Sequence, residues 1–138
     1  MSGLPPLALL LVAPDLAGGG PRTKDHLYGI HNLSMADKNR IQQGNATYDL
    51  SLKIVRLCLK CYVPVGLENP HTSFLWMMPG LVKLLRSAAT TAVDFCQYGE
   101  PWRKRTRLAF WLADHDLLPC ARCRGRGGVC SRTNKYHI

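Results

Sequence analysis

Four residues near the C-terminus have side chains of the kind that bind a transition metal. Cys120, Cys123, Cys130 and His137 follow the pattern C-x2-C-x6-C-x6-H. Three thiolates and one imidazole form a ligand set that zinc accepts in closed tetrahedral sites. The glycine-rich stretch between the second and third cysteine would allow a tight turn. The spacing predicts a zinc site, and the alternative is a basic tail that carries unpaired thiols.

A carboxylate and an amide follow a short apolar run in the stretch YVPVGLENPHTSFLW, residues 62–76. Glu68 and Asn69 come directly after this run, and Pro70 limits further strand pairing. In open α/β sheets, ligands bind just beyond the carboxyl ends of the strands. A carboxylate in a partly dry crevice can acquire a raised pKa and exchange a proton with a bound ring. We expect Glu68 and Asn69 to contribute to a site at this strand end or to cap the helix that follows.

The chain of 138 residues is strongly basic, with a formal net charge of +9. Half of its 18 lysines and arginines fall in the last 36 residues: Arg103, Lys104, Arg105, Arg107, Arg122, Arg124, Arg126, Arg132 and Lys135. This excess indicates a polyanionic partner such as nucleic acid or a membrane surface, and the alternative is a solvated basic face. The six cysteines are expected to be reduced, buried or metal-bound, since Cys58 and Cys61 share a helical pattern that disfavours a disulfide.

An alternation of helices and strands is expected to position these residues. A helix should begin after Ser34, with Asp37 as a capping-box-like partner, and Gly44 should weaken or kink it. Its apolar stripe is expected at Leu50, Ile54, Leu57, Cys58 and Cys61. Further along, apolar runs predict strands at 63–67, 92–96 and 106–111 and a helix from Pro79. This order predicts an α/β fold with a sheet that is at least partly parallel.

The chain is expected to have three parts: a poorly structured lead-in (1–32), an α/β core (33–112) and a basic segment rich in cysteine and glycine (113–138). The lead-in could also hold the remnant of a strand. Its apolar run, residues 4–13, is about half as long as a membrane span requires. We therefore expect an intracellular protein with no membrane segment.

Two motifs in order make the chain resemble the C-terminal half of the catalytic domain of cytosine-C5 DNA methyltransferases. The first is Glu68-Asn69-Pro70 at a strand end, and the second lies in VDFCQYGEPWRKRTRLAFW, residues 93–111. The sequence of these two motifs looks most like that of the divergent methylase-like domains of phage and mobile elements. The resemblance runs from about residue 33 to the C-terminus and implies part of a Rossmann-like sheet.

The resemblance also implies roles for individual residues. In that family a cytosine is flipped out of the duplex and methylated from S-adenosylmethionine. Glu68, with Asn69 beside it, would contact the ring, and Arg105 or Arg107 would hold the base and the Glu68 carboxylate. The DNA contacts would come from Trp102, Arg103 and Lys104 in the second motif. The basic C-terminal tail is expected to add Arg124 and Arg126.

The sequence departs from the family in its N-terminal half. Neither a glycine-bearing cofactor loop after a first strand nor a Pro-Cys nucleophile is found there. The sequence therefore predicts a truncated or degenerate methyltransferase-like domain that is inactive alone and needs a partner chain with the missing half. The alternatives are a non-catalytic basic module that binds nucleic acid, and a fragment with no independent role.

Overall fold

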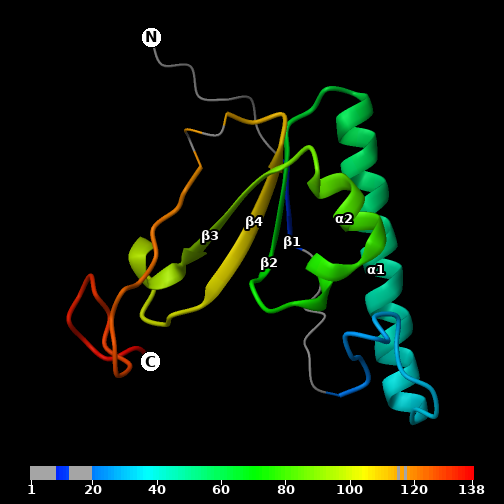
Figure 1. The fold of residues 1–138 in the computed structure, drawn as a ribbon, viewed down its shortest axis with the longest axis horizontal. Helices are drawn as coiled ribbons and strands as arrows, with labels where there is room; N and C mark the ends of the chain where they lie inside the picture. Colours follow the sequence, from blue (N-terminus) through cyan, green and yellow to red (C-terminus); the bar gives the residue numbers. More distant parts are fainter. Residues whose placement is uncertain (1–8, 13–19, 115, 117) are drawn as a thin grey trace.

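The computed structural model describes residues 9–12, 20–114, 116 and 118–138 (Figure 1). Within them the chain has mixed α/β architecture, which confirms the expected fold class in its broad form. The elements in chain order are β1 Leu9–Val12, α1 Met35–Lys60, β2 Val65–Pro70, the 3-10 helix η1 Phe74–Met77, α2 Pro79–Leu85, β3 Ala89–Asp94, the 3-10 helix η2 Phe95–Tyr98 and β4 Arg105–Trp111. None of the helices in these ranges is long and apolar enough to cross a membrane.

The sheet is mixed, with the strand order β1-β2-β4-β3. β1 pairs in parallel with β2, whereas β4 lies between β2 and β3 and is antiparallel to both. The carboxyl ends of β2 and β3 therefore meet the amino end of β4 at one end of the sheet. In this register Asn69 lies opposite Arg107, and Asp94 lies opposite Arg105.

Helix α1 starts where the sequence predicts. The Ser34 Oγ accepts a hydrogen bond from the Asp37 N–H (3.1 Å) and donates one to the Asp37 carboxylate (2.8 Å). These two contacts satisfy one of the free N–H groups of the first turn and hold the capping carboxylate in place. The helix continues without a break through Gly44 to Lys60.

The buried face of α1 differs from the expected stripe. Tyr48, Leu52 and Val55 are buried, whereas Leu50 and Leu57 are 56% and 60% exposed. Offsets of three and four residues place the buried side chains on one side of a helix with 3.6 residues per turn. The expected stripe included Leu50 and Leu57 because of their apolar character, although each lies on the solvent side.

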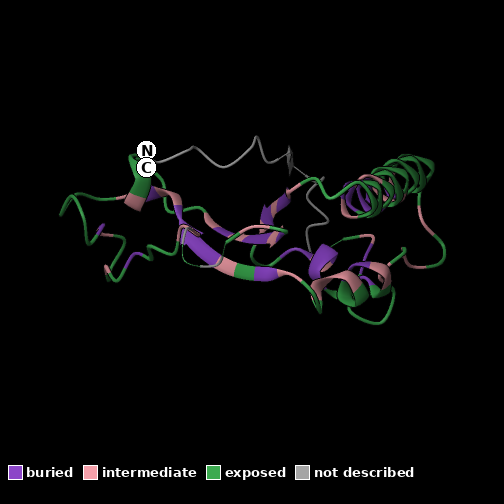
Figure 2. Ribbon diagram, turned by 90° about the horizontal axis from the view of Figure 1, so that it is seen from above, coloured by how far each residue is buried: buried purple, intermediate pink, exposed green. Residues whose placement is uncertain are grey.

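The main core lies between one face of the sheet and the helices. Figure 2 shows the buried positions of α1 turned toward the sheet and its outer side exposed. Val65, Leu67 and Trp111 contribute to this core from the strands, and the Trp111 indole N–H donates to the Leu84 carbonyl (2.9 Å). Gly80 is required beneath α1, because a Cβ there would lie 2.6 Å from the Tyr48 Oη.

The described part of the lead-in is fixed to α1. Arg22 is buried and donates to the Leu27 carbonyl, to Asn45 Oδ1 (2.9 Å) and to the Ile41 carbonyl (3.3 Å). A guanidinium that donates to three acceptors holds the segment from residue 20 onward against the helix. Strand β1 pairs with β2, in keeping with the alternative of a strand in the lead-in.

Strand β2 extends beyond its predicted end. It covers Val65–Pro70 rather than 63–67, so Glu68 and Asn69 belong to the strand and Pro70 is its last paired residue, opposite Thr106. The Pro70 carbonyl accepts a hydrogen bond from the Trp76 indole N–H (2.9 Å), which fixes the turn into η1.

The C-terminal segment lies against η2 and the end of β3, on the side of the molecule away from α1 (Figure 1). Its backbone joins the Ala121 carbonyl to the Asp94 N–H (3.1 Å) and the Ile138 N–H to the Pro101 carbonyl (3.1 Å). The segment expected as a separate part at 113–138 is therefore attached to the sheet.

Candidate metal centre and adjoining basic surface

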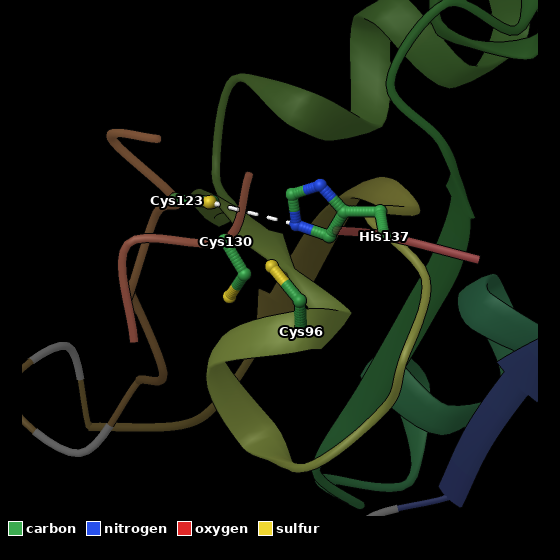
Figure 3. A group of neighbouring side chains, drawn as sticks. All are labelled: Cys96, Cys123, Cys130 and His137. Atoms are coloured by element: carbon green, nitrogen blue, oxygen red, sulfur yellow. Dashed lines mark hydrogen bonds between the residues drawn. The ribbon is translucent and has the colours of Figure 1, made fainter. Parts of the chain in front are cut away.

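Four potential metal ligands converge beside η2. The Sγ atoms of Cys96, Cys123 and Cys130 and a ring nitrogen of His137 all lie within 4.8 Å of one another (Figure 3). The Cys123 Sγ and the His137 Nε2 are 3.8 Å apart. The three cysteines are buried and form a small cluster separate from the main core. All six cysteines of the chain are free thiols, as expected.

The C-terminal turn brings three of these ligands together. The Cys130 N–H donates to the Lys135 carbonyl (2.8 Å), and the His137 N–H donates to the Gly128 carbonyl (2.9 Å). Gly125 is essential to this turn, because a Cβ there would lie 1.7 Å from the Val129 carbonyl oxygen. The glycine-rich sequence therefore forms the tight turn that its composition predicts.

Asp94 fixes the segment that carries Cys123 to the sheet. Its buried carboxylate accepts the Cys123 N–H (2.8 Å) and two hydrogen bonds from Arg105 (3.0 and 2.9 Å). Arg103 approaches the same carboxylate at 3.7 Å and donates to the Cys123 carbonyl (2.9 Å). Burial acts to raise the pKa of Asp94, but the hydrogen bonds from Arg105 and Cys123 and the nearby positive charges lower it below its usual value. Asp94 is therefore a charged anchor between β4 and the metal cluster.

The thiols of the cluster are electrostatically unequal. The Ser131 N–H holds the pKa of Cys123 down at about 6, although burial opposes this effect. Burial acts to raise the pKa of Cys130 as well. The N–H groups of Arg132 and Thr133 outweigh it and lower this pKa to about 7. Burial raises the pKa of Cys96 to about 11. These shifts favour the thiolate, the form that binds metals, at Cys123 over Cys96.

His137 complements this negative charge. Burial acts to lower its pKa, but contacts with the thiols of Cys130 and Cys123 outweigh burial and raise it. The imidazole therefore holds a proton more firmly beside these thiols than it would in water. A bound metal would take the place of that proton.

Three of the four predicted metal ligands come together, and the fourth does not. Cys120 is exposed and lies outside the cluster, where Cys96 takes its place. The C-x2-C spacing favours Cys120 in the sequence, whereas Cys96 is separated from the other ligands by β4 and reaches them only through the fold. A cysteine directly after a buried strand, in VDFC, is the available sequence signal for Cys96.

The residues expected at the strand end are arranged differently from the family's implied pattern. The Glu68 carboxylate lies 3.6 Å from the Lys104 Nζ, whereas Arg105 binds Asp94 and the Arg107 guanidinium lies 4.9 Å from the centre of the Trp76 ring. Successive strand side chains point to opposite faces. Because of this alternation, Glu68 lies on the face opposite Asn69 and Arg107, and neither expected arginine holds it.

The remaining residues expected to contact nucleic acid lie on the surface. Trp102 is 44% exposed, and Arg124 and Arg126 are exposed on the C-terminal segment. An open pocket lies beside the metal cluster and is lined by Gln97, Arg105, Cys120, Ala121, Arg122, Cys123, Arg124 and Ser131. The candidate metal ligands, the basic pocket and the expected Arg124 therefore adjoin one another.

Comparison with known proteins found no matching family model and no significant match among curated proteins or solved structures.

Proposed function

We propose that the chain is a zinc-binding domain that binds nucleic acid through basic residues held around the metal centre. The convergence of Cys96, Cys123, Cys130 and His137 to within 4.8 Å carries this proposal. With Zn–S distances of about 2.3 Å, a tetrahedral zinc site places its ligand atoms about 3.8 Å apart, so small side-chain adjustments suffice. Three thiolates and an imidazole suit zinc and do not suit the hard cations calcium and magnesium.

The arrangement is typical of a structural metal site rather than a catalytic one. All four ligands would come from protein, which leaves no open position for a substrate. The Cys123 N–H bonded to Asp94 supplies the supporting contact that orients a ligand. Zinc would thus join the C-terminal segment to η2 and hold its arginines in place. Reduced thiols are favoured inside the cell, so we also propose an intracellular location.

Cobalt substitution tests the metal site and its ligands. Cobalt(II) bound by three thiolates and one imidazole should give intense visible bands typical of tetrahedral geometry, with one ion per chain by native mass spectrometry. Cys96→Ser should weaken zinc binding at least about tenfold, while Cys120→Ser, an exposed thiol outside the cluster, should leave it unchanged. Loss of binding in Cys120→Ser with retention in Cys96→Ser would overturn the ligand set.

The nucleic-acid partner is supported by the charge distribution. The C-terminal segment carries five exposed cations: Arg122, Arg124, Arg126, Arg132 and Lys135. Affinity that comes from such residues falls steeply with salt, because binding releases counterions from the phosphates. A salt titration with labelled DNA and RNA oligonucleotides tests this part of the proposal. Affinity independent of salt would contradict it.

A second candidate function is the truncated, cytosine-C5 methyltransferase-like role with DNA as its partner. The observation that favours it is the meeting of the two motifs at one end of the sheet, where Asn69 lies opposite Arg107 and Glu68 lies beside Lys104. We propose that this part of a Rossmann-like sheet contacts an extrahelical cytosine. Methyl transfer from S-adenosylmethionine would require a partner chain that supplies the nucleophile and the cofactor loop.

Discrimination between bases tests this second function. Duplex DNA with a mispaired cytosine should bind more tightly than the same duplex with a mispaired thymine. Either mispaired base is easy to extrude, so the difference measures the contact of Glu68 with the cytosine ring. Glu68→Gln should abolish the difference, whereas Glu100→Gln, at an exposed position in the loop after η2, should retain it. Equal binding of both duplexes by the unaltered protein would rule out cytosine recognition.

A further inference from the structure

The pocket beside the metal cluster has a cationic lining. Arg105, Arg122 and Arg124 line it together with the polar side chains of Gln97 and Ser131, and no carboxylate is among the lining residues. A concave surface that gathers guanidinium groups concentrates positive potential and attracts anions. The planar guanidinium also matches the geometry of phosphate oxygens.

The three arginines differ in their free charge. Arg105 forms a two-bonded ion pair with Asp94, which largely neutralises it. Arg122 uses its Nε to donate to the Ala92 carbonyl (3.3 Å), and its charge has no carboxylate partner in the described part of the chain. The Arg124 side chain forms no hydrogen bond or ion pair with any described residue. Two uncompensated positive charges therefore face this pocket.

We propose that this pocket binds a phosphate group of a nucleic-acid backbone, with Arg122 and Arg124 as its charged contacts. The inference rests on the proposed nucleic-acid function and names the place where the strand is held. Arg103 and Arg105, which were expected to contact nucleic acid and to hold the base, both approach the Asp94 carboxylate, and Arg105 also lines the pocket.

The metal centre sets the shape of this phosphate pocket. Arg122 and Arg124 flank the ligand Cys123, and Ser131 follows the ligand Cys130. The Ser131 Oγ accepts the Arg124 N–H (3.1 Å), so the two ligand segments are joined across the pocket. Metal binding at Cys123 and Cys130 would therefore fix both walls, and metal loss should weaken phosphate binding.

Removal of the two free charges tests the proposal in the full chain. Binding of a fluorescein-labelled oligodeoxythymidylate is measured by anisotropy over a range of salt concentrations for an Arg122→Gln, Arg124→Gln double variant. Its matched control is Lys53→Gln with Arg56→Gln, two exposed cations of α1 on the other side of the molecule (Figure 1). Both variants lose two charges, so only a local contact distinguishes them.

The pocket variant should lose at least about tenfold in affinity at low salt, and its slope of log affinity against log salt should fall by about 0.7 to 1.4. The α1 control should match the unaltered protein, and both variants should keep their metal by native mass spectrometry. Equal losses in the two variants would overturn the pocket while leaving the nucleic-acid function intact. Absence of oligonucleotide binding by the unaltered protein would instead overturn that function.

Inorganic phosphate distinguishes the two sources of the anion. Weak competition, at millimolar concentrations, is expected if the pocket holds one phosphate of a longer strand. Displacement of the oligonucleotide by micromolar phosphate would overturn the assignment to nucleic acid and identify a pocket for free phosphate.

Discussion

Asp94 connects Arg103 and Arg105 to the cluster of candidate metal ligands through one carboxylate. It accepts hydrogen bonds from Arg105 on β4 and from the Cys123 N–H, and it also lies within 3.7 Å of Arg103. A buried carboxylate is stable in its charged form only when such partners surround it. In the sequence Asp94 lies in the middle of the predicted strand 92–96, and its partners are visible only once β4 is paired with β3.

Asp94→Asn should therefore destabilise the fold. The substitution removes the negative charge but leaves Arg105 and Arg103 in place, so we expect a loss of about 3 kcal/mol in the free energy of unfolding. Urea denaturation monitored by circular dichroism measures this loss. Asp49→Asn, at an exposed position of α1, is the control and should change stability by less than about 0.5 kcal/mol. A variant as stable as the control would show that Asp94 is not an anchor.

The elements were predictable to different degrees. Helix α1 begins as predicted because its cap depends on Ser34 and Asp37, which are neighbours in the sequence. The predicted strand 106–111 differs from β4 by one residue, because a continuous apolar run forms its second half. The buried face of α1 was predicted only in part, because apolar character alone does not tell which side of the helix meets the sheet. Cys58 is buried and Ile54 packs against the core, whereas Leu50 and Leu57 are exposed.

The same limit explains which candidate metal ligands could be predicted. The ligands Cys123, Cys130 and His137 belong to one local turn, so their spacing was informative. Cys96 joins them only because β3 and β4 are paired, which is a long-range contact. The C-x2-C spacing predicts Cys120 in its place, because Cys120 is close to Cys123 in the sequence.

Two leucines of α1 test the orientation of this helix. Leu52→Ala should cost about 2 to 4 kcal/mol of unfolding free energy, because the side chain is buried against the sheet. Leu57→Ala, at a position 60% exposed, should cost less than about 1 kcal/mol. Thermal and urea denaturation of both variants provide the comparison. A larger loss for Leu57→Ala would place the expected stripe on the buried side after all.

The molecule as a whole has two separate buried clusters. The main core joins α1, α2 and the sheet, whereas the cysteine cluster lies beside η2 and the C-terminal segment. In both views these parts lie on opposite sides of the molecule (Figures 1 and 2). Loss of a bound metal should therefore destabilise the C-terminal segment and η2 far more than α1 and the main core.

Chelation of the metal should release the C-terminal segment and leave the main core in place. Hydrogen exchange followed by mass spectrometry should show faster exchange in residues 118–138 and in η2, while α1 keeps its protection. Cys96→Ser removes a metal ligand without any chelator. It should therefore give the same pattern of exchange as chelation. Equal loss of protection in α1 would mean that the two clusters unfold as one unit.

The position of β4 between β2 and β3 has a consequence for the order of folding. Cys96 precedes β4 in the chain, and the other three ligands follow it. The four ligands can meet in their observed arrangement only after this central strand has closed its long-range pairings, which form slowly relative to local turns. We expect the complete site to form late in refolding. The rate at which the cobalt bands appear would then report the rate at which the sheet is completed.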